Sequence, residues 1–491
     1  MSNIQVKLTR SSLTLSNCPA DVALQLQYTR EDISHEQGSF KSTPVSVGYA
    51  SYDVKTLICR TYPNALHLVK SIAESLGHTL EITDQRSRPD LDLSKINKAD
   101  YRTACYQALE AVSKAKASGL IIGPTGVGKT SILCGLVKML PAHFKVLVTT
   151  EDKNVTSALY QALSEAMPSE KIGMYLDKKS LPGRIITTNL DSLKEFTQGQ
   201  MAYNGYALKD FDVWICDEVH RLPVQSRIPF LSQFRPIFSW GLTATPKRAD
   251  NSHILNEVIF GAPIYSVGFQ EVLDIQEKTG EKGIVPVKVM VFPLTTEKPI
   301  PDEKSLYWKI RTAYLANDSF KALVKAIDQM LPQDAKSMIF VDTIRLGYIL
   351  KKLMPYREFV HGQHSLDYRK SILAKLKEED KVRGVICTDI WSEGIDVPDL
   401  SYVIDCSAKV SPNRIIQRAG RAARSASGKE SGVYIMFLCL SSEHLFNQGL
   451  AKLKAINALG WDVKFMFARD VVKTLPFDRV PVLTELGGFS D

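Results

Sequence analysis

From about residue 96 to residue 285, short apolar runs alternate with segments that have helical spacing. Parallel strands that are buried on both faces read as continuous apolar runs, and their alternation with helices is typical of α/β domains. The pattern therefore predicts an α/β domain with a parallel sheet. Its expected strands are Leu120 to Ile122, Val146 to Val148, Ile185 to Ile186, Val213 to Ile215 and Gly241 to Leu242.

A second series of the same kind begins near residue 286, so we expect two tandem α/β domains. A charged, glycine-containing stretch from Gln276 to Gly283 is the expected linker between them, and a helix is expected from His444 to Ala458. The expected strands of the second series are Ser337 to Val341, Gly384 to Cys387, Tyr402 to Ile404 and Val433 to Phe437.

The first 95 residues carry a different pattern. Two strands are expected near Ile4 to Leu8 and Lys55 to Tyr62, then a helix over Asn64 to Leu76 and a strand over Thr79 to Ile82. This mixture predicts a small α+β accessory domain. The expected divisions are 1–95 (accessory), 96–285 (first α/β domain), 286–445 (second α/β domain) and 446–491 (C-terminal extension).

Composition adds limits to this picture. Of the 491 residues, 44% are apolar and 23% charged, which is normal for a folded globular protein and argues against disorder. The net charge of +8 fits a nucleic-acid partner or a solvated basic surface equally well. The eight cysteines are scattered without a CxxC pair, so we expect reduced, buried thiols in a cytoplasmic protein. Neither a signal peptide nor a membrane-spanning run is expected.

A glycine-rich loop follows the first expected strand and opens a helix from Ser131 to Leu140. Glycines allow main-chain N–H groups to turn toward phosphates, the lysine adds positive charge at the β- and γ-phosphates, and the final threonine can bind Mg²⁺. The loop is predicted to bind a nucleoside triphosphate. Its binding residues are Gly123, Thr125, Gly126, Val127, Gly128, Lys129 and Thr130.

Two carboxylates end the strand that begins at Val213. Side chains at the carboxyl end of a parallel strand face the crevice where ligands bind. Asp217 is therefore a candidate Mg²⁺ ligand, and Glu218 a candidate group to orient or deprotonate the attacking water. An exposed acidic turn is the alternative. His220 either couples this site to its neighbours or is a plain structural histidine.

A basic segment lies far downstream, on a helix expected to start near Pro412 or Asn413. Gln417, Arg421 and Arg424 would then share one helix face by their three- and four-residue spacing. Two arginines on one face suit the transition-state charge of a γ-phosphate, as arginine fingers do. The alternatives are a solvated basic face and a nucleic-acid contact.

With Thr243 to Pro246 between them, these segments occur in an order that resembles the superfamily 2 helicases of the DExH type. The resemblance implies two RecA-like motor domains, the cofactors ATP and Mg²⁺, and catalytic roles for Lys129, Asp217, Glu218, Gln417, Arg421 and Arg424. It also implies nucleotide contacts from Gln107, Gly394 and Asp396. The implied nucleic-acid contacts are Thr149, Thr150, Thr187, Thr188, Asn189, Thr343, Arg345 and Thr388.

Within that superfamily, Gly241 to Arg248 followed by Phe260-Gly261 resembles the group of the XPB and phage UvsW-type branch-migration helicases. This group implies a monomeric motor that remodels forked or branched DNA with little regard to sequence, in the host cytoplasm if a phage encodes it. One departure concerns an arginine that the group often has three residues before the adenine glutamine. Ala104 stands at that position, and Arg102 is the nearest substitute.

Three other functions compete with this one. An RNA helicase is disfavoured because the DEAD-type ALARGLD form is absent near Thr388. A nucleic-acid-binding protein that uses ATP only as a switch is disfavoured by the full set of expected catalytic residues. A motor subunit whose partners supply specificity also agrees with the sequence.

Overall fold

The chain forms two compact units that divide between Val267 and Gly268. The computed structural model describes residues 2–36, 39–176, 179–192, 207–222, 234–246, 251–378, 382–391, 397, 400–408, 412–426 and 428–466. The finer boundaries expected at residues 95, 285 and 445 remain predictions.

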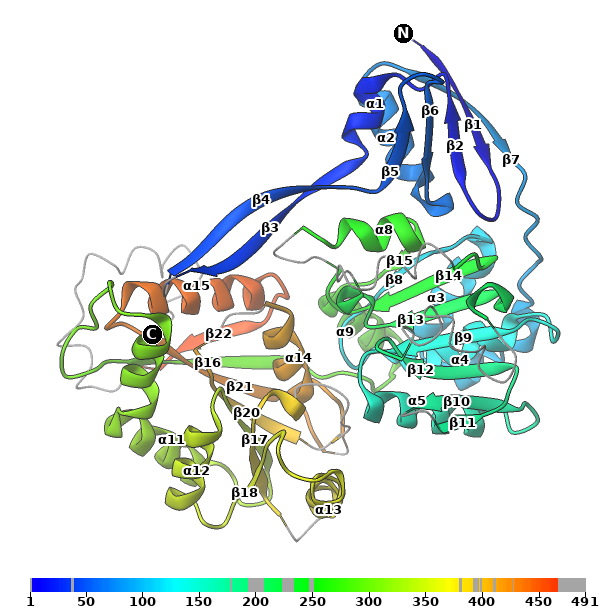
Figure 1. The fold of residues 1–491 in the computed structure, drawn as a ribbon. Helices are drawn as coiled ribbons and strands as arrows, with labels where there is room; N and C mark the ends of the chain where they lie inside the picture. Colours follow the sequence, from blue (N-terminus) through cyan, green and yellow to red (C-terminus); the bar gives the residue numbers. More distant parts are fainter. Residues whose placement is uncertain are drawn as a thin grey trace. The chain divides into compact units, whose positions relative to one another are not determined.

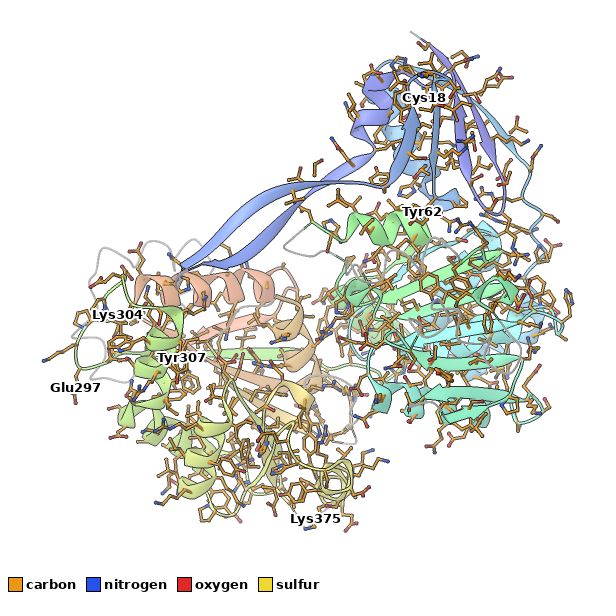
Figure 2. The ribbon with its side chains drawn as sticks, in the orientation of Figure 1. Cys18, Tyr62, Glu297, Lys304, Tyr307 and Lys375 are labelled. Carbon is orange, nitrogen blue, oxygen red and sulfur yellow. The ribbon has the colours of Figure 1, made fainter. Side chains whose placement is uncertain are left out.

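The first unit begins with a five-stranded sheet of order β5-β6-β2-β1-β7 (Figure 1). Its first strand alternates exposed and buried residues, so that Ile4, Val6 and Leu8 all enter one core. Cys18, labelled in Figure 2, is buried in the same core. The elements of this N-terminal layer are β1 (Asn3–Leu8), β2 (Leu13–Ser16), α1 (Ala20–Gln25), β5 (Ala50–Asp53), β6 (Ile58–Thr61), α2 (Leu66–Ser75) and β7 (Thr79–Asp84).

Two long strands, β3 (Gln27–Glu36) and β4 (Ser39–Gly48), pair antiparallel as a separate two-stranded ribbon that no sequence pattern predicted. At the base of the ribbon, Tyr49 N–H donates to the Leu26 carbonyl over 3.2 Å. The expected strands at Ile4 and Thr79 and the expected helix after Asn64 are confirmed as β1, β7 and α2.

The rest of the first unit is an eight-stranded sheet of order β11-β10-β12-β9-β13-β14-β8-β15. All of its pairings are parallel except that of β11. Each of the five expected strands is present. The strands are β8 (Gly119–Ile122), β9 (Val146–Thr150), β10 (Ile172–Leu176), β11 (Lys179–Leu181), β12 (Ile185–Asn189), β13 (Val213–Asp217), β14 (Phe238–Thr243) and β15 (Pro263–Ser266).

The N-terminal layer is fastened to this sheet through helix α8 (Ile254–Phe260). Asn64 Nδ2 donates to the Ile259 carbonyl over 2.8 Å, and His67 Nε2 lies 3.1 Å from Glu257 Oε2. The remaining helices include α3 (Thr103–Ala115), α4 (Lys129–Met139) and α5 (Lys153–Ala166).

The second unit holds a seven-stranded, all-parallel sheet of order β18-β19-β17-β20-β21-β16-β22. Its strands are β16 (Val287–Leu294), β17 (Lys336–Val341), β18 (Glu358–Val360), β19 (Gly384–Cys387), β20 (Leu400–Cys406), β21 (Gly432–Cys439) and β22 (Asp462–Phe465). Its helices include α9 (Phe269–Thr279), α11 (Asp318–Met330), α12 (Ile344–Leu353), α13 (Leu366–Lys377), α14 (Pro412–Ala422) and α15 (Glu443–Asn457).

The two parallel α/β sheets expected from the sequence are thus confirmed, as is the late helix, α15. The expected linker from Gln276 is wrong in its first part, because α9 continues to Thr279 and ends at Gly280, where φ is +71°. Gln276 also exchanges two 2.8 Å hydrogen bonds with the main chain of Ile284. Among the helices described, none is long and apolar enough to cross a membrane.

Candidate nucleotide and nucleic-acid site

The phosphate-binding loop joins β8 to α4, as predicted. Gly126 and Gly128 have φ values of +90° and +110°, which side chains rarely adopt. A Cβ on Gly128 would stand 2.7 Å from the Cys105 sulfur, so the loop packs closely on α3. Arg102 Nη1 donates to the Gly126 carbonyl over 2.7 Å. Arg102, the nearest substitute for the arginine that is absent at position 104, therefore contacts the phosphate-binding loop itself.

Four side chains connect the loop to the ends of two nearby strands, β13 and β14. Lys129 Nζ lies 3.2 Å from Glu218 Oε1. His220 Nδ1 lies 3.3 Å from Glu218 Oε2 and 3.1 Å from Thr243 Oγ1, which also accepts the Thr245 N–H over 3.1 Å. The series places the predicted catalytic lysine and glutamate in contact. It also shows that His220 couples Glu218 to the Thr243 segment.

Glu218 is ionised in this environment. Burial disfavours its charged form, but the charge of Lys129 and the hydrogen bond from His220 outweigh burial and lower its pKa to about 2. Its main chain is left-handed, with φ +50°. A glutamate in that conformation is strained.

Thr130 lies in the first turn of α4, after the loop that follows β8, and Asp217 is the last residue of β13; β14 separates β8 and β13 in the sheet. A hydroxyl and one carboxylate, completed by phosphate oxygens and water, suit Mg²⁺, which keeps several waters in such sites. The residues present therefore fit the ion. Gly126 and Gly128, whose positive φ values only glycine adopts readily, supply the matching phosphate cradle.

The adenine glutamine predicted from the resemblance lies on α3. Gln107 Oε1 accepts a 3.2 Å hydrogen bond from the Tyr265 hydroxyl of β15. This contact holds the amide at the edge of the sheet that continues from β8 to β15. No sequence motif predicted that Tyr265 would contact Gln107.

The expected nucleic-acid side chains of the first unit are buried, each at most 4% exposed: Thr149, Thr150, Thr187, Thr188 and Asn189. Several are engaged inside the unit. Thr149 Oγ1 accepts the Trp214 indole N–H over 2.9 Å, and Thr187 donates to the Gly173 carbonyl over 3.3 Å. Contact with a strand would therefore come from main-chain groups and neighbouring residues.

The second unit places its expected nucleic-acid residues nearer the surface. Arg345 is exposed, whereas Thr343 and Thr388 are half-buried. Thr343 caps α12 by accepting the Leu346 N–H over 3.2 Å. Gly394 and Asp396, expected to contact the nucleotide, lie outside the described residues.

Helix α14 starts where predicted and carries Gln417 and Arg421, both nearly buried. The expectation that Arg424 shares their helix face is wrong. The helix ends at Ala422, and the chain then turns so that Arg424 forms a main-chain bridge with Ile284.

Arg418, which no motif singled out, anchors α14. Its guanidinium is 3% exposed, donates to Asp405 Oδ1 over 2.6 Å and also contacts Asp389. Burial opposes ionisation of Asp405, yet Lys452 and Arg418 together hold its pKa well below the ordinary value. The sequence did contain a signal for this ion pair. Arg418 directly follows the predicted Gln417, and Asp405 interrupts an apolar strand.

Comparison with known proteins gives two family matches, one in each unit. Residues 95–248 match the model described as type III restriction enzyme, res subunit, and residues 318–426 match the helicase conserved C-terminal domain.

Individual relatives extend over both units. The chain is 25% identical over 373 residues to the DNA 3'-5' translocase XPB2 of Sulfurisphaera tokodaii, a match covering 67% of this chain and 79% of that protein. It is 24% identical to the helicase/translocase subunit XPB of Dictyostelium discoideum, covering 65% of this chain but 41% of the relative. The fold is similar to that of Saccharomyces cerevisiae Dbp5 bound to RNA and ADP BeF3, with a TM-score of 0.55, 17% identity and coverage of 79% and 94%. The predicted pair of RecA-like domains is therefore confirmed.

Proposed function

We propose that this chain is an ATP-dependent helicase of superfamily 2 and, within it, a DExH-type translocase that moves along DNA and remodels branched DNA. The observation that carries the proposal is the contact series from Lys129 through Glu218 and His220 to Thr243. It joins a phosphate-binding charge, an ionised carboxylate and the segment expected to relay hydrolysis to the bound strand.

Each residue then has a defined task. The N–H groups of the glycine loop and Lys129 bind phosphates, while Thr130 and Asp217 would hold Mg²⁺, which neutralises charge on the phosphates. Glu218, ionised at neutral pH, orients the attacking water and accepts its proton. Arg421 and Arg424 stabilise the charge of the transition state.

The choice of DNA is supported by the similarity to a named DNA translocase along two thirds of the chain. Contacts with the sugar-phosphate backbone carry little sequence information, so binding should tolerate any sequence and weaken steeply with salt. An RNA helicase is the alternative.

The test is ATP turnover without nucleic acid and with single-stranded DNA, forked DNA or RNA. We expect stimulation by DNA and the largest response to forks. Lys129→Ala should abolish turnover, whereas Glu218→Gln should bind ATP and fail to hydrolyse it. Near-normal turnover in both variants would contradict the motor assignment, and stimulation by RNA alone would favour the alternative.

A further inference from the structure

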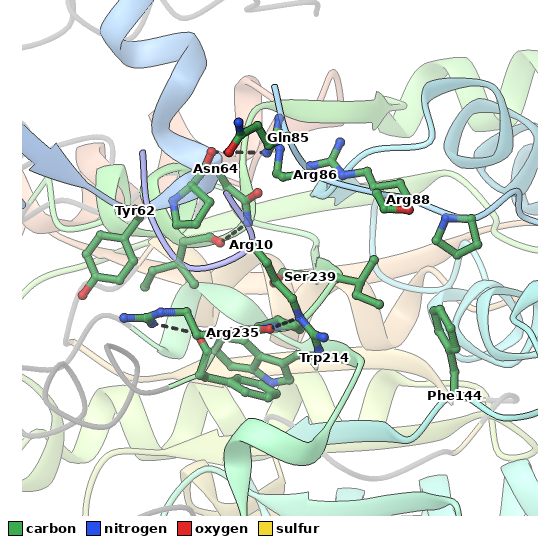
Figure 3. Close-up of a pocket in the computed structure, with 17 residues that line it drawn as sticks. Arg10, Tyr62, Asn64, Gln85, Arg86, Arg88, Phe144, Trp214, Arg235 and Ser239 are labelled. Carbon is green, nitrogen blue, oxygen red and sulfur yellow. Dashed lines mark hydrogen bonds between the residues drawn. The ribbon is translucent and has the colours of Figure 1, made fainter. Parts of the chain in front are cut away.

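A pocket of about 520 Å³ lies between the N-terminal layer and the first α/β sheet (Figure 3). It is lined by the second residues of two parallel strands, Trp214 of β13 and Ser239 of β14. Glu218 follows the opposite end of β13, about 13 Å away at the usual rise per residue. The pocket is therefore at the edge of the sheet opposite the phosphate-binding loop.

The lining is cationic: among the described residues it includes four arginines and no carboxylate, and the arginines are Arg10, Arg86, Arg88 and Arg235. Two of them are neutralised from outside the pocket. Arg86 pairs with Asp84 at 2.6 Å, and Arg10 lies 3.4 Å from Asp212.

The other two guanidinium groups contact only main-chain carbonyls within the described part of the chain. Arg88 Nη1 donates to Lys116 over 3.2 Å, and Arg235 Nη1 donates to Phe234 over 2.9 Å. Arg88 Nε is buried there without a hydrogen-bond partner. Burial, and then repulsion from Arg86, lower the pKa of Arg88 to about 10. A bound anion would give Arg88 Nε a hydrogen-bond acceptor and would offset the burial of its charge.

Aromatic side chains also line the pocket: Tyr62 is half-buried, whereas Phe144, Trp214 and Phe234 are each at most 6% exposed. Guanidinium groups bind phosphate oxygens in pairs, and an aromatic face such as that of Tyr62 can stack on any nucleobase. The volume falls in the range of small-ligand sites, roughly 300–1,000 Å³. It is too narrow for a duplex, whose bases are already stacked inside a wide cylinder.

We propose that this pocket is a second nucleic-acid site that takes an unpaired nucleotide of a strand, with Arg88 and Arg235 as two separate phosphate contacts. The proposal rests on the proposed function, because a strand opened by the motor is the expected source of that nucleotide. A free nucleotide carries the same phosphate and base, so the test separates the two sources.

The pocket variant is the double substitution Arg88→Gln and Arg235→Gln. Its matched control is Arg60→Gln with Lys70→Gln, which removes the same charge from exposed positions of the N-terminal layer outside the lining. Affinity for a fluorescent 20-nucleotide single strand is measured by anisotropy at several salt concentrations.

The pocket variant should bind about tenfold or more weakly than the control at 0.1 M salt. The slope of log affinity against log salt should fall by roughly 1.4, for two lost phosphate contacts. Arg88→Lys with Arg235→Lys should restore much of the affinity. ATP turnover without DNA and the Tm should match the control, which separates a site from a folding defect.

A second measurement locates the ligand directly. Phenylglyoxal modification of Arg88 and Arg235, quantified by mass spectrometry, is compared with and without the oligonucleotide or dAMP. Protection by the oligonucleotide assigns a strand, and protection by dAMP alone assigns a free nucleotide. Unchanged affinity in the pocket variant together with no protection would overturn the proposal. If the protein binds no nucleic acid at all, the proposed function fails, and the dAMP measurement alone decides the pocket.

Discussion

Glu218 combines a left-handed main chain with a partly buried carboxylate, 23% exposed, and both features cost free energy that its neighbours must offset. Strain of this kind costs on the order of 1–3 kcal/mol and persists where the surroundings over-determine it. The contacts of the Glu218 carboxylate with Lys129 and His220 hold the residue in this conformation. The residue is thus held ready as a base by the same contacts that tie it to Thr243.

The lowered pKa of Glu218 predicts how stability depends on pH. Because the unfolded carboxyl binds its proton near pH 4.5 and the folded one near pH 2, the ionised form stabilises the fold above about pH 4.5. That contribution is lost as the pH falls toward 2. The Tm advantage of the natural protein over Glu218→Gln should therefore shrink between pH 5 and pH 3.5. Parallel Tm curves for the two proteins would contradict the ion pair.

Arg421 and Arg424 should each be needed for turnover, although they sit in different local structures. Alanine at either position should lower kcat on the order of 10³-fold, as expected of arginine fingers, with a smaller change in ATP affinity. Lys375→Ala on the exposed surface of α13 is the control (Figure 2). Full activity in either arginine variant would make that residue a surface or structural charge.

At the scale of elements, α14 is held by buried charge as well as by apolar packing. Arg418, Asp405 and Lys452 lie inside the second unit, and Lys452 Nζ is 3.4 Å from Asp405. Removing one partner of a buried pair leaves an uncompensated charge, which is more costly than losing the pair as a whole. The network is thus the positioning device for Gln417 and Arg421.

Arg418→Met should lower the free energy of unfolding by about 3–5 kcal/mol in urea denaturation. The control on the same helix is Arg414→Met, because the Arg414–Asp389 pair is exposed and should contribute less than about 1 kcal/mol. In Arg418→Met combined with Asp405→Asn, the losses should not add. Additive losses would mean that the two residues act independently.

The elements differ in how well the sequence revealed them. Strands such as β9 and β13 were predictable because burial on both faces forces continuous apolar runs. The β3–β4 ribbon was not, because its polar sequence carries no apolar run. The departure of Arg424 from α14 depends on main-chain pairing with Ile284, a contact that spacing along one segment cannot contain.

The site shows the same division between local pattern and tertiary contact. The glycine loop and the Asp217-Glu218 pair were predictable because their spacing is set by phosphate and metal chemistry. The burial of Thr149 and Thr187 was not, since a threonine at a strand end can face solvent or bond inward with the same sequence. Arg88 and Arg235 come to line one pocket only through folding.

The ribbon can be removed at its base, and Val47 of β4 is the ribbon side chain that packs against the core of the layer and would be lost with it. Because Leu26 and Tyr49 are hydrogen-bonded neighbours, residues 27–48 can be replaced by Gly-Gly. A two-stranded ribbon suits a nucleic-acid groove, so fork unwinding should fall while ATP turnover on single strands stays within about twofold. Helicase and ATPase assays on the same preparation test this. Equal loss in both assays would mean that the ribbon supports the motor fold.

At the scale of the whole molecule, the N-terminal layer and the first α/β sheet share a unit and a charged pocket, and the second α/β sheet forms a unit of its own. Deleting residues 1–95 would therefore expose the surfaces around Ile259 and Arg235. Ribbon removal and pocket substitution are cleaner tests of DNA engagement than deletion of the layer.

The position of β16 has a consequence during synthesis. This strand is the first of its sheet to leave the ribosome, yet its hydrogen-bonded neighbours are β21 and β22, the last two. The strand therefore remains unpaired while about 140 further residues are synthesised, which takes roughly 7–30 s at ordinary translation rates. Its buried valines are Val287, Val289 and Val291. A nascent chain that stalls before Gly432 would expose an apolar strand whose main-chain N–H and C=O groups are unpaired. Premature termination there should therefore yield aggregates and chaperone-bound fragments.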